Sequence, residues 1–163
     1  MKKETKKQLL IGAALVLELL FLLLYLNGRI DRLLDSDMSS EMILGQLLAR
    51  NNGILSDQWY YSTELRVLNT QLIYALFFRL SSNWHFVRMA STLVLWCVLI
   101  ASYGVLCRVM GCKKSFGVTA LLLAAPVSES YFRFVLAGVY YVPHLAIAFA
   151  ALALNEVYFK AQP

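Results

Sequence analysis

The chain has 163 residues, of which 60% are hydrophobic and only 15% carry a charge. Charged residues make up about a quarter of an ordinary soluble domain, so this composition excludes a soluble globular domain and indicates a membrane protein. The formal net charge is +5, but the lysines stand at the ends of apolar stretches and no basic patch is interleaved with aromatic residues. A nucleic-acid-binding protein is therefore excluded as well.

The first apolar stretch, residues 9–26, follows the basic segment KKETKK and is long enough to cross hydrocarbon roughly 30 Å thick. No small-residue cleavage site follows it, so an uncleaved anchor is predicted. Inside it, Glu18 is expected to face a bundle interior. Three further spans are predicted at about 89–107, 116–134 and 141–158. The chain is thus predicted to be a single membrane domain, an all-α integral membrane protein with about four transmembrane helices.

The lysines predict the orientation of these spans. They fall in three places, before the first span, at 113–114 and at 160. A cytoplasmic N-terminus puts all of them on the cytoplasmic side, in agreement with the positive-inside rule. We therefore expect a multi-pass protein of the cell membrane whose N-terminus is cytoplasmic and whose residues 28–85 form an outer loop.

The third span has two interpretations. Its uninterrupted apolar run, residues 116–127, is too short to cross alone. Continuation to 134 would lengthen it and would place Glu129 and Arg133 four residues apart, where a helical ion pair can form. In the other interpretation, which we favour, the helix ends at Pro126 and the segment SESYFRF lies at the outer interface.

The outer loop, residues 28–85, is far longer than a connection requires and is predicted to contain two amphipathic surface helices. The first covers Met38–Arg50, with Asp37 as its N-cap and the segment NNG as its stop signal. Its apolar stripe holds Ile43, Leu44, Leu47 and Leu48, with Glu41 and Gln46 off the stripe. The second helix is predicted over Glu64–Leu80.

The outer loop and the span that follows it carry a family resemblance, in three successive stretches. They are DSDMSSEMILGQLLARNNG (35–53), LRVLNTQLIYALFFRL (65–80) and NWHFVRMASTLVLWCVLIASYGVLCRVMG (83–111). The order of features resembles the N-terminal part of the GT-C membrane glycosyltransferases: an acidic cluster follows a span, two surface helices come next, and an arginine begins the next span. The protein-mannosyltransferase-like and aminoarabinose-transferase-like families of bacteria are the most similar. The resemblance covers about residues 8–158.

This resemblance implies that a sugar passes from a polyprenyl-phosphate carrier to an acceptor on the outer face of the membrane. An acidic residue of the first outer loop is then expected near the catalytic centre. The proline-rich acceptor-loop segment usual in the family is replaced here by LNTQL around Asn69. Family members have many more spans, so we expect a missing C-terminal part or a partner membrane subunit to complete the enzyme.

The candidate catalytic residues are Asp35 and Asp37, because a carboxylate within hydrogen-bond reach can activate an acceptor hydroxyl. Capping of a surface helix is the alternative role of this cluster. Arg66 and Arg88 are candidates for stabilising the departing phosphate, although Arg88 at a span end can instead snorkel to the interface. The remaining candidates for substrate binding are Glu41, Glu129 and His144.

The sequence predicts no resident metal site and leaves the cofactor open, with a divalent cation as one candidate. His85 and His144 are more simply explained by packing at the interface, and the three cysteines have no zinc-like spacing. The expected ligands are a polyprenyl-phosphate sugar donor and membrane lipid. The alternative function is a small non-catalytic membrane protein that binds a partner or lipid through its outer-loop helices.

Overall fold

Every element of the described chain is helical. The computed structural model describes residues 2–61 and 69–162. Its three long helices are α1 (Lys2–Asn27), α4 (Trp84–Val109) and α7 (Val142–Ala161), and each is long and apolar enough to cross a membrane. The predicted spans 9–26 and 89–107 lie within α1 and α4, and the predicted span 141–158 overlaps α7. The all-α fold class and the membrane character expected from composition are therefore supported.

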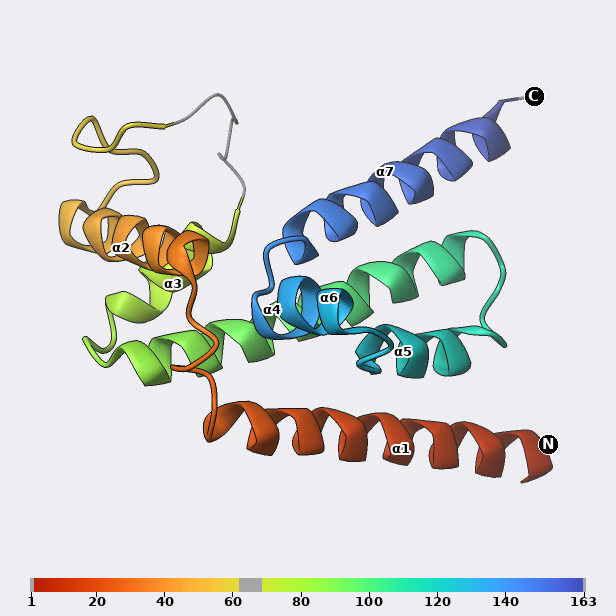
Figure 1. Ribbon diagram of the computed structural model, residues 1–163. Helices are drawn as coiled ribbons and strands as arrows, with labels where there is room; N and C mark the ends of the chain where they lie inside the picture. The colour runs from red at the N-terminus through yellow and green to blue at the C-terminus, as the bar shows by residue number, and fades with distance from the viewer. Residues whose placement is uncertain (1, 62–68, 163) are drawn as a thin grey trace.

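The long helices place the lysine-bearing segments together. In Figure 1 the N-terminus, the turn after α4 and the C-terminus lie at one end, and α2 and α3 lie at the other. At the first end the Nζ atom of Lys160 donates to the carbonyl of Val109 at 2.7 Å, which ties α7 to α4. We call this the lysine end and the opposite one the α2–α3 end.

The third apolar segment is a broken helix. It consists of α5 (Phe116–Ala124), α6 (Glu129–Tyr131) and the π-helix η1 (Phe132–Ala137), with a bend of 88° between α5 and the rest. Ala125, which precedes Pro126, has the extended backbone that a following proline imposes (φ −74°, ψ 136°). The favoured helix end near Pro126 agrees with this geometry. A continuous helix from 116 to 134 does not, although Glu129 and Arg133 do pair at 4.0 Å.

The main hydrophobic core joins η1 to the long helices. Its buried residues come from α1 (Leu22, Leu26), from α4 (Leu95, Trp96, Leu99) and from the stretch 135–142. The indole Nε1 of Trp96 donates to the carbonyl of Leu136 at 2.9 Å, and the hydroxyl of Tyr131 donates to the carbonyl of Leu123 at 2.6 Å. These bonds satisfy carbonyls near the break, where the regular helical pattern is interrupted.

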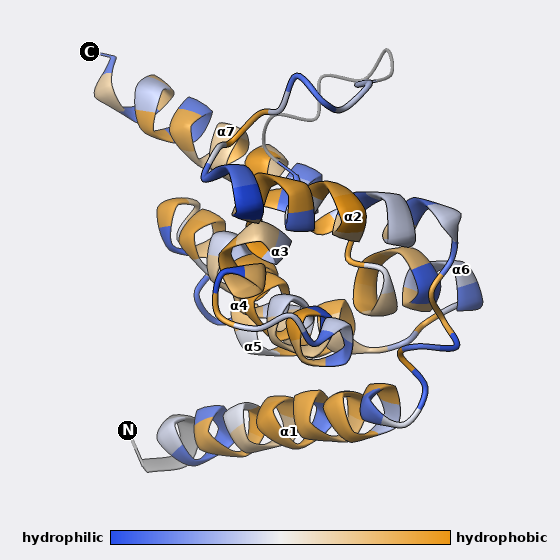
Figure 2. Ribbon diagram, turned by 90° about the vertical axis from the view of Figure 1, so that its left-hand side faces the viewer, coloured by the Kyte–Doolittle hydropathy of each residue, from blue (hydrophilic) through white to orange (hydrophobic). Residues whose placement is uncertain are grey.

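Helices α2 (Ser36–Asn51) and α3 (Thr70–Phe78) pack on each other and α3 packs on α4. Figure 2 shows α2 with hydrophobic and hydrophilic sides, whereas α1 is hydrophobic along most of its length. Neither α2 nor α3 is long enough to be a candidate span. The predicted second helix, Glu64–Leu80, corresponds to α3, and its residues 64–68 lie outside the described residues.

The structure corrects two details of α2. The N-cap is Asp35, not Asp37, so the helix begins at Ser36. Glu41 was expected off the buried stripe but is only 4% exposed, while the predicted stripe residue Ile43 is 48% exposed. The buried stripe is therefore rotated toward Glu41. The stop signal is confirmed, because α2 ends at Asn51 and Asn52 adopts the left-handed conformation with φ 50°.

Candidate functional site at the α2–α3 end

Asp35 stands where three segments of the chain meet. It follows the loop after α1 and caps α2, with its Oδ1 atom accepting from the backbone N–H of Met38 at 2.9 Å. The same oxygen accepts from the hydroxyl of Tyr140 at 2.5 Å, across 105 residues of sequence. Tyr140 belongs to the link between η1 and α7. The acidic cluster is thus tied to the broken third segment as well as to its own helix.

The surroundings of Asp35 hold it in the charged form. Burial alone would raise the pKa of this carboxyl. Three hydrogen bonds lower it, from the backbone of Met38, from the Tyr140 hydroxyl and from the backbone of Asp37, and the charge of Arg88 lowers it further. Together these effects outweigh burial, so the pKa of Asp35 lies below its ordinary value. Burial and the neighbouring Asp35 raise the pKa of Tyr140. Tyr140 therefore remains a hydroxyl donor and Asp35 a carboxylate at neutral pH.

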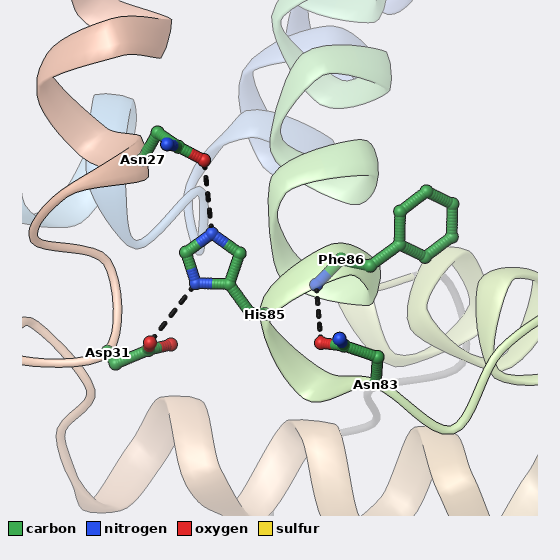
Figure 3. Close-up of polar contacts among 5 residues, drawn as sticks. All are labelled: Asn27, Asp31, Asn83, His85 and Phe86. Carbon is green, nitrogen blue, oxygen red and sulfur yellow. Dashed lines mark hydrogen bonds and ion pairs between the residues drawn. The ribbon is translucent and has the colours of Figure 1, made fainter.

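Arg88 is the buried cation of this end of the molecule. It lies in the second turn of α4, where Asn83 caps the helix by accepting from the N–H of Phe86 at 3.1 Å (Figure 3). The Arg88 side chain is only 2% exposed. Its Nη2 donates to the sulfur of Met38 and, at 3.4 Å, to the carbonyl of Ala137. Its Nε and Nη1 atoms have no hydrogen-bond partner within residues 2–61 and 69–162.

A buried guanidinium with two uncommitted donors is costly to maintain. Each buried donor without a partner costs about 1–3 kcal/mol, and more when it is charged. Arg88 is therefore not snorkelling to water, which was one expectation from its position at the start of a span. The uncommitted Nε and Nη1 atoms are donors of the kind that bind an anionic group.

Glu41 belongs to a buried polar cluster between α2 and α3. Its Oε1 accepts from the side-chain amide of Asn69 at 3.1 Å, and Asn69 in turn caps α3 by accepting from the N–H of Thr70 at 2.8 Å. Asp37, one turn earlier on α2, is exposed. Of these two carboxylates, Glu41 is buried against α3 and Asp37 faces outward. Glu41 thus holds α3 in place.

A second polar contact joins the end of α1 to the start of α4. Figure 3 shows the His85 ring between Asn27 and Asp31. Its Nδ1 lies 3.1 Å from the Asp31 carboxylate and its Nε2 lies 3.1 Å from the Asn27 side-chain oxygen. His85 is therefore a tertiary bridge rather than a freely packed interfacial ring. Neither this bridge nor the Tyr140 bond was predicted, because both join residues far apart in the sequence.

The other candidate residues lie away from Asp35 or outside the described residues. Glu129 is exposed and pairs with Arg133, and His144 is exposed with its Nδ1 atom 3.3 Å from the carbonyl of Tyr140. Arg66 lies outside the described residues. Within the described ranges, no group of three or more His, Cys, Asp or Glu side chains is arranged to hold a metal ion. The structure thus brings together Asp35, Arg88 and Tyr140.

Comparison with protein-family models, with curated proteins and with solved structures gives no match to this chain. Over residues 2–61 and 69–162, the fold is all-helical with three candidate membrane spans, or four if the bent pair of helices is one span. Its polar site is concentrated at one end of the spans.

Proposed function

We propose that this chain is the N-terminal part of a membrane glycosyltransferase that takes its sugar from a polyprenyl-phosphate carrier. The proposed site faces the outer side of the cell membrane, with the N-terminus and the lysine end in the cytoplasm. Helices α2 and α3 then lie near the outer leaflet. The proposal rests on the family resemblance of residues 35–111 and on the chemistry that meets at the α2–α3 end.

The observation that carries the proposal is that a buried cation and an acidic cluster lie close together, since Met38 donates its N–H to Asp35 and its sulfur accepts from Arg88. Asp35 and Arg88 are close enough for the charge of Arg88 to lower the pKa of Asp35. Transfer from a polyprenyl-phosphate sugar needs a base for the acceptor hydroxyl and positive charge for the departing phosphate. Two uncommitted donors of Arg88 suit the second task, and the carboxylates at the start of α2 suit the first.

The two aspartates, Asp35 and Asp37, make different contacts, which supports different roles for them. Asp35 accepts from Met38, Tyr140 and the backbone of Asp37, so it is engaged in holding the start of α2. Asp37 is exposed one turn before Glu41. We therefore assign the general base to Asp37 and a positioning role to Asp35. A divalent cation, if the reaction uses one, would come to this cluster with the phosphate of the donor.

The test uses membranes from cells that express the gene together with the sequence that follows it. Transfer from a radiolabelled polyprenyl-phosphate sugar is measured for Asp37→Asn and for Asp57→Asn, an exposed acid of the same loop. Asp37→Asn is expected to reduce transfer by roughly two orders of magnitude, the usual contribution of a general base, and Asp57→Asn to leave it unchanged. Full activity of the Asp35→Asn/Asp37→Asn double variant would reject the proposal and leave capping as the role of the cluster.

A second candidate function is a non-catalytic membrane protein that binds a partner or lipid through the outer loop. The loop after α2 presents three large apolar side chains, Ile54, Leu55 and Tyr60, which are 66%, 53% and 92% exposed. Such a surface is typical of a contact with another protein or a bilayer. Ile54→Ser with Leu55→Ser would abolish that contact, whereas transfer by the enzyme proposed above would be insensitive to it.

A further inference from the structure

The lysine end contains a pocket of about 360 Å³ at the turn between α4 and α5. It is far from the candidate site, which lies at the opposite end of α4 (Figure 1). The residues that matter for its chemistry are Ala101, Gly104, Val105, Arg108, Lys113 and Phe116. One side of the pocket is apolar and the other is positively charged.

Three positive features converge on the charged side. Arg108 lies in the last turn of α4, and Lys113 lies in the turn that follows. The third feature is the N-terminus of α5, where Phe116 begins the helix and also lines the pocket. The side chain of Ser115 does not cap this helix in the structure described, since its hydroxyl donates to the Cys112 carbonyl at 2.8 Å. Two cations and a helix N-terminus favour an anion of phosphate type.

The apolar side of the pocket continues onto the exposed surface of α4. Ala101 is exposed and Val105 is 54% exposed. Gly104 lets the Phe116 ring close the inner wall, because a Cβ atom at this position would lie 3.2 Å from the ring. A free phosphate ion would use only the charged side. A phospholipid uses both, with its phosphate on the cations and an acyl chain along Ala101 and Val105.

We propose that this pocket binds the head-group phosphate of an anionic glycerophospholipid from the leaflet at the lysine end. The occupant is a bilayer phospholipid, not the polyprenyl-phosphate donor, for which the α2–α3 end is the proposed site. The charge and shape of the pocket support this assignment independently of the proposed function. Basic pockets between helices at a membrane surface are typical sites for anionic head groups.

The experiment measures the lipid retained by the purified chain in native mass spectrometry, with phosphatidylglycerol and phosphatidylcholine offered at equal concentration. The wild-type chain is expected to bind phosphatidylglycerol more tightly. Arg108→Gln with Lys113→Gln should weaken phosphatidylglycerol binding by roughly 30-fold, the effect expected of two cations at a bilayer surface. The matched control is Lys6→Gln with Lys7→Gln, which removes the same charge from the lysine end outside the pocket. It should retain the lipid.

A further variant tests the pocket without changing its charge. Ala101→Trp fills the apolar side from a position that is already exposed, so the fold is expected to tolerate it. It should lose phosphatidylglycerol as the double variant does. The proposal is overturned if the wild-type chain does not distinguish the two lipids, if the two double variants lose lipid equally, or if Ala101→Trp retains it. It is also overturned if inorganic phosphate at the same concentration displaces the lipid.

Discussion

The close approach of α2 and α3 at Gly45 makes the attachment of the acidic cluster sensitive to a single side chain. A Cβ atom at Gly45 would lie 2.7 Å from the Cβ atom of Tyr74 and 3.0 Å from the carbonyl oxygen of Gln71. Neither atom is the flexible end of a side chain. We therefore predict that Gly45→Val forces the two helices apart, exposing the cluster formed by Leu44, Leu48 and Ala75.

The expected cost follows from two opposing effects. Overpacking a close contact costs about 1–3 kcal/mol. Replacing glycine inside a helix by valine recovers only a few tenths of a kcal/mol of helix propensity. The net loss should therefore be about 1–3 kcal/mol for the docking of α2 on α3. Each 1.4 kcal/mol changes an equilibrium constant about tenfold. The population of molecules in which α2 is undocked from α3 should therefore rise roughly 5- to 100-fold.

Limited trypsin digestion in mild detergent measures this population, because Arg50 is exposed at the end of α2 and becomes a better substrate when α2 opens. The control is Gly12→Val in α1, where an added Cβ meets nothing within 4 Å. Cleavage after Arg50 should accelerate in the Gly45 variant and not in the Gly12 variant. Equal cleavage rates in the two variants would refute the close-packing argument.

Three further predictions concern the site and the orientation. Tyr140→Phe removes a hydrogen bond to the Asp35 carboxylate and raises the pKa of Asp35. The stabilisation that Asp35 contributes is present at neutral pH and is lost as the pH falls through its folded pKa. The acid-induced loss of helix measured by circular dichroism should therefore move to higher pH. Arg88→Met removes two unpartnered buried donor atoms and loses only the contact with the Met38 sulfur and the long 3.4 Å bond to the Ala137 carbonyl, so resistance to unfolding by sodium dodecyl sulfate should stay equal or increase. Binding of a polyprenyl-phosphate donor should fall, and a clear loss of resistance would contradict the prediction. In a background without native cysteines, a membrane-impermeant thiol reagent should label Gln58→Cys and not Ser115→Cys in intact cells, and the reverse pattern would overturn the orientation.

Composition and periodicity were sufficient to predict the helical class and the ranges of the long apolar helices, because those depend on local hydrophobicity. They were also sufficient for the end of α2, since an Asn-Asn-Gly run favours a left-handed residue there. The start of α2 was placed two residues late. Asp35 and Asp37 are both suitable N-caps, and the bond from Tyr140 that engages Asp35 comes from 105 residues away.

The prediction of the buried face of α2 was wrong for a related reason. A carboxylate is normally placed on the solvent side of an amphipathic helix, and Glu41 was assigned there. Its burial depends on the amide of Asn69, which local patterning does not connect to it. The bridge between Asp31 and His85 is of the same kind. Polar contacts between distant segments leave no periodic signal, so a single sequence could suggest the residues but not their partners.

The break in the third segment and the candidate site are parts of one arrangement. Where a helix is interrupted within a membrane, the carbonyls it frees need donors from neighbouring elements. Helix α4 supplies two of them, the indole of Trp96 to Leu136 and the guanidinium of Arg88 to Ala137. The link that follows contains Val139, a buried β-branched residue at φ 54°, and then Tyr140, whose hydroxyl reaches Asp35. The broken third segment therefore contacts α4 through Arg88 and the N-cap of α2 through Tyr140, and in this way it is joined to the candidate site.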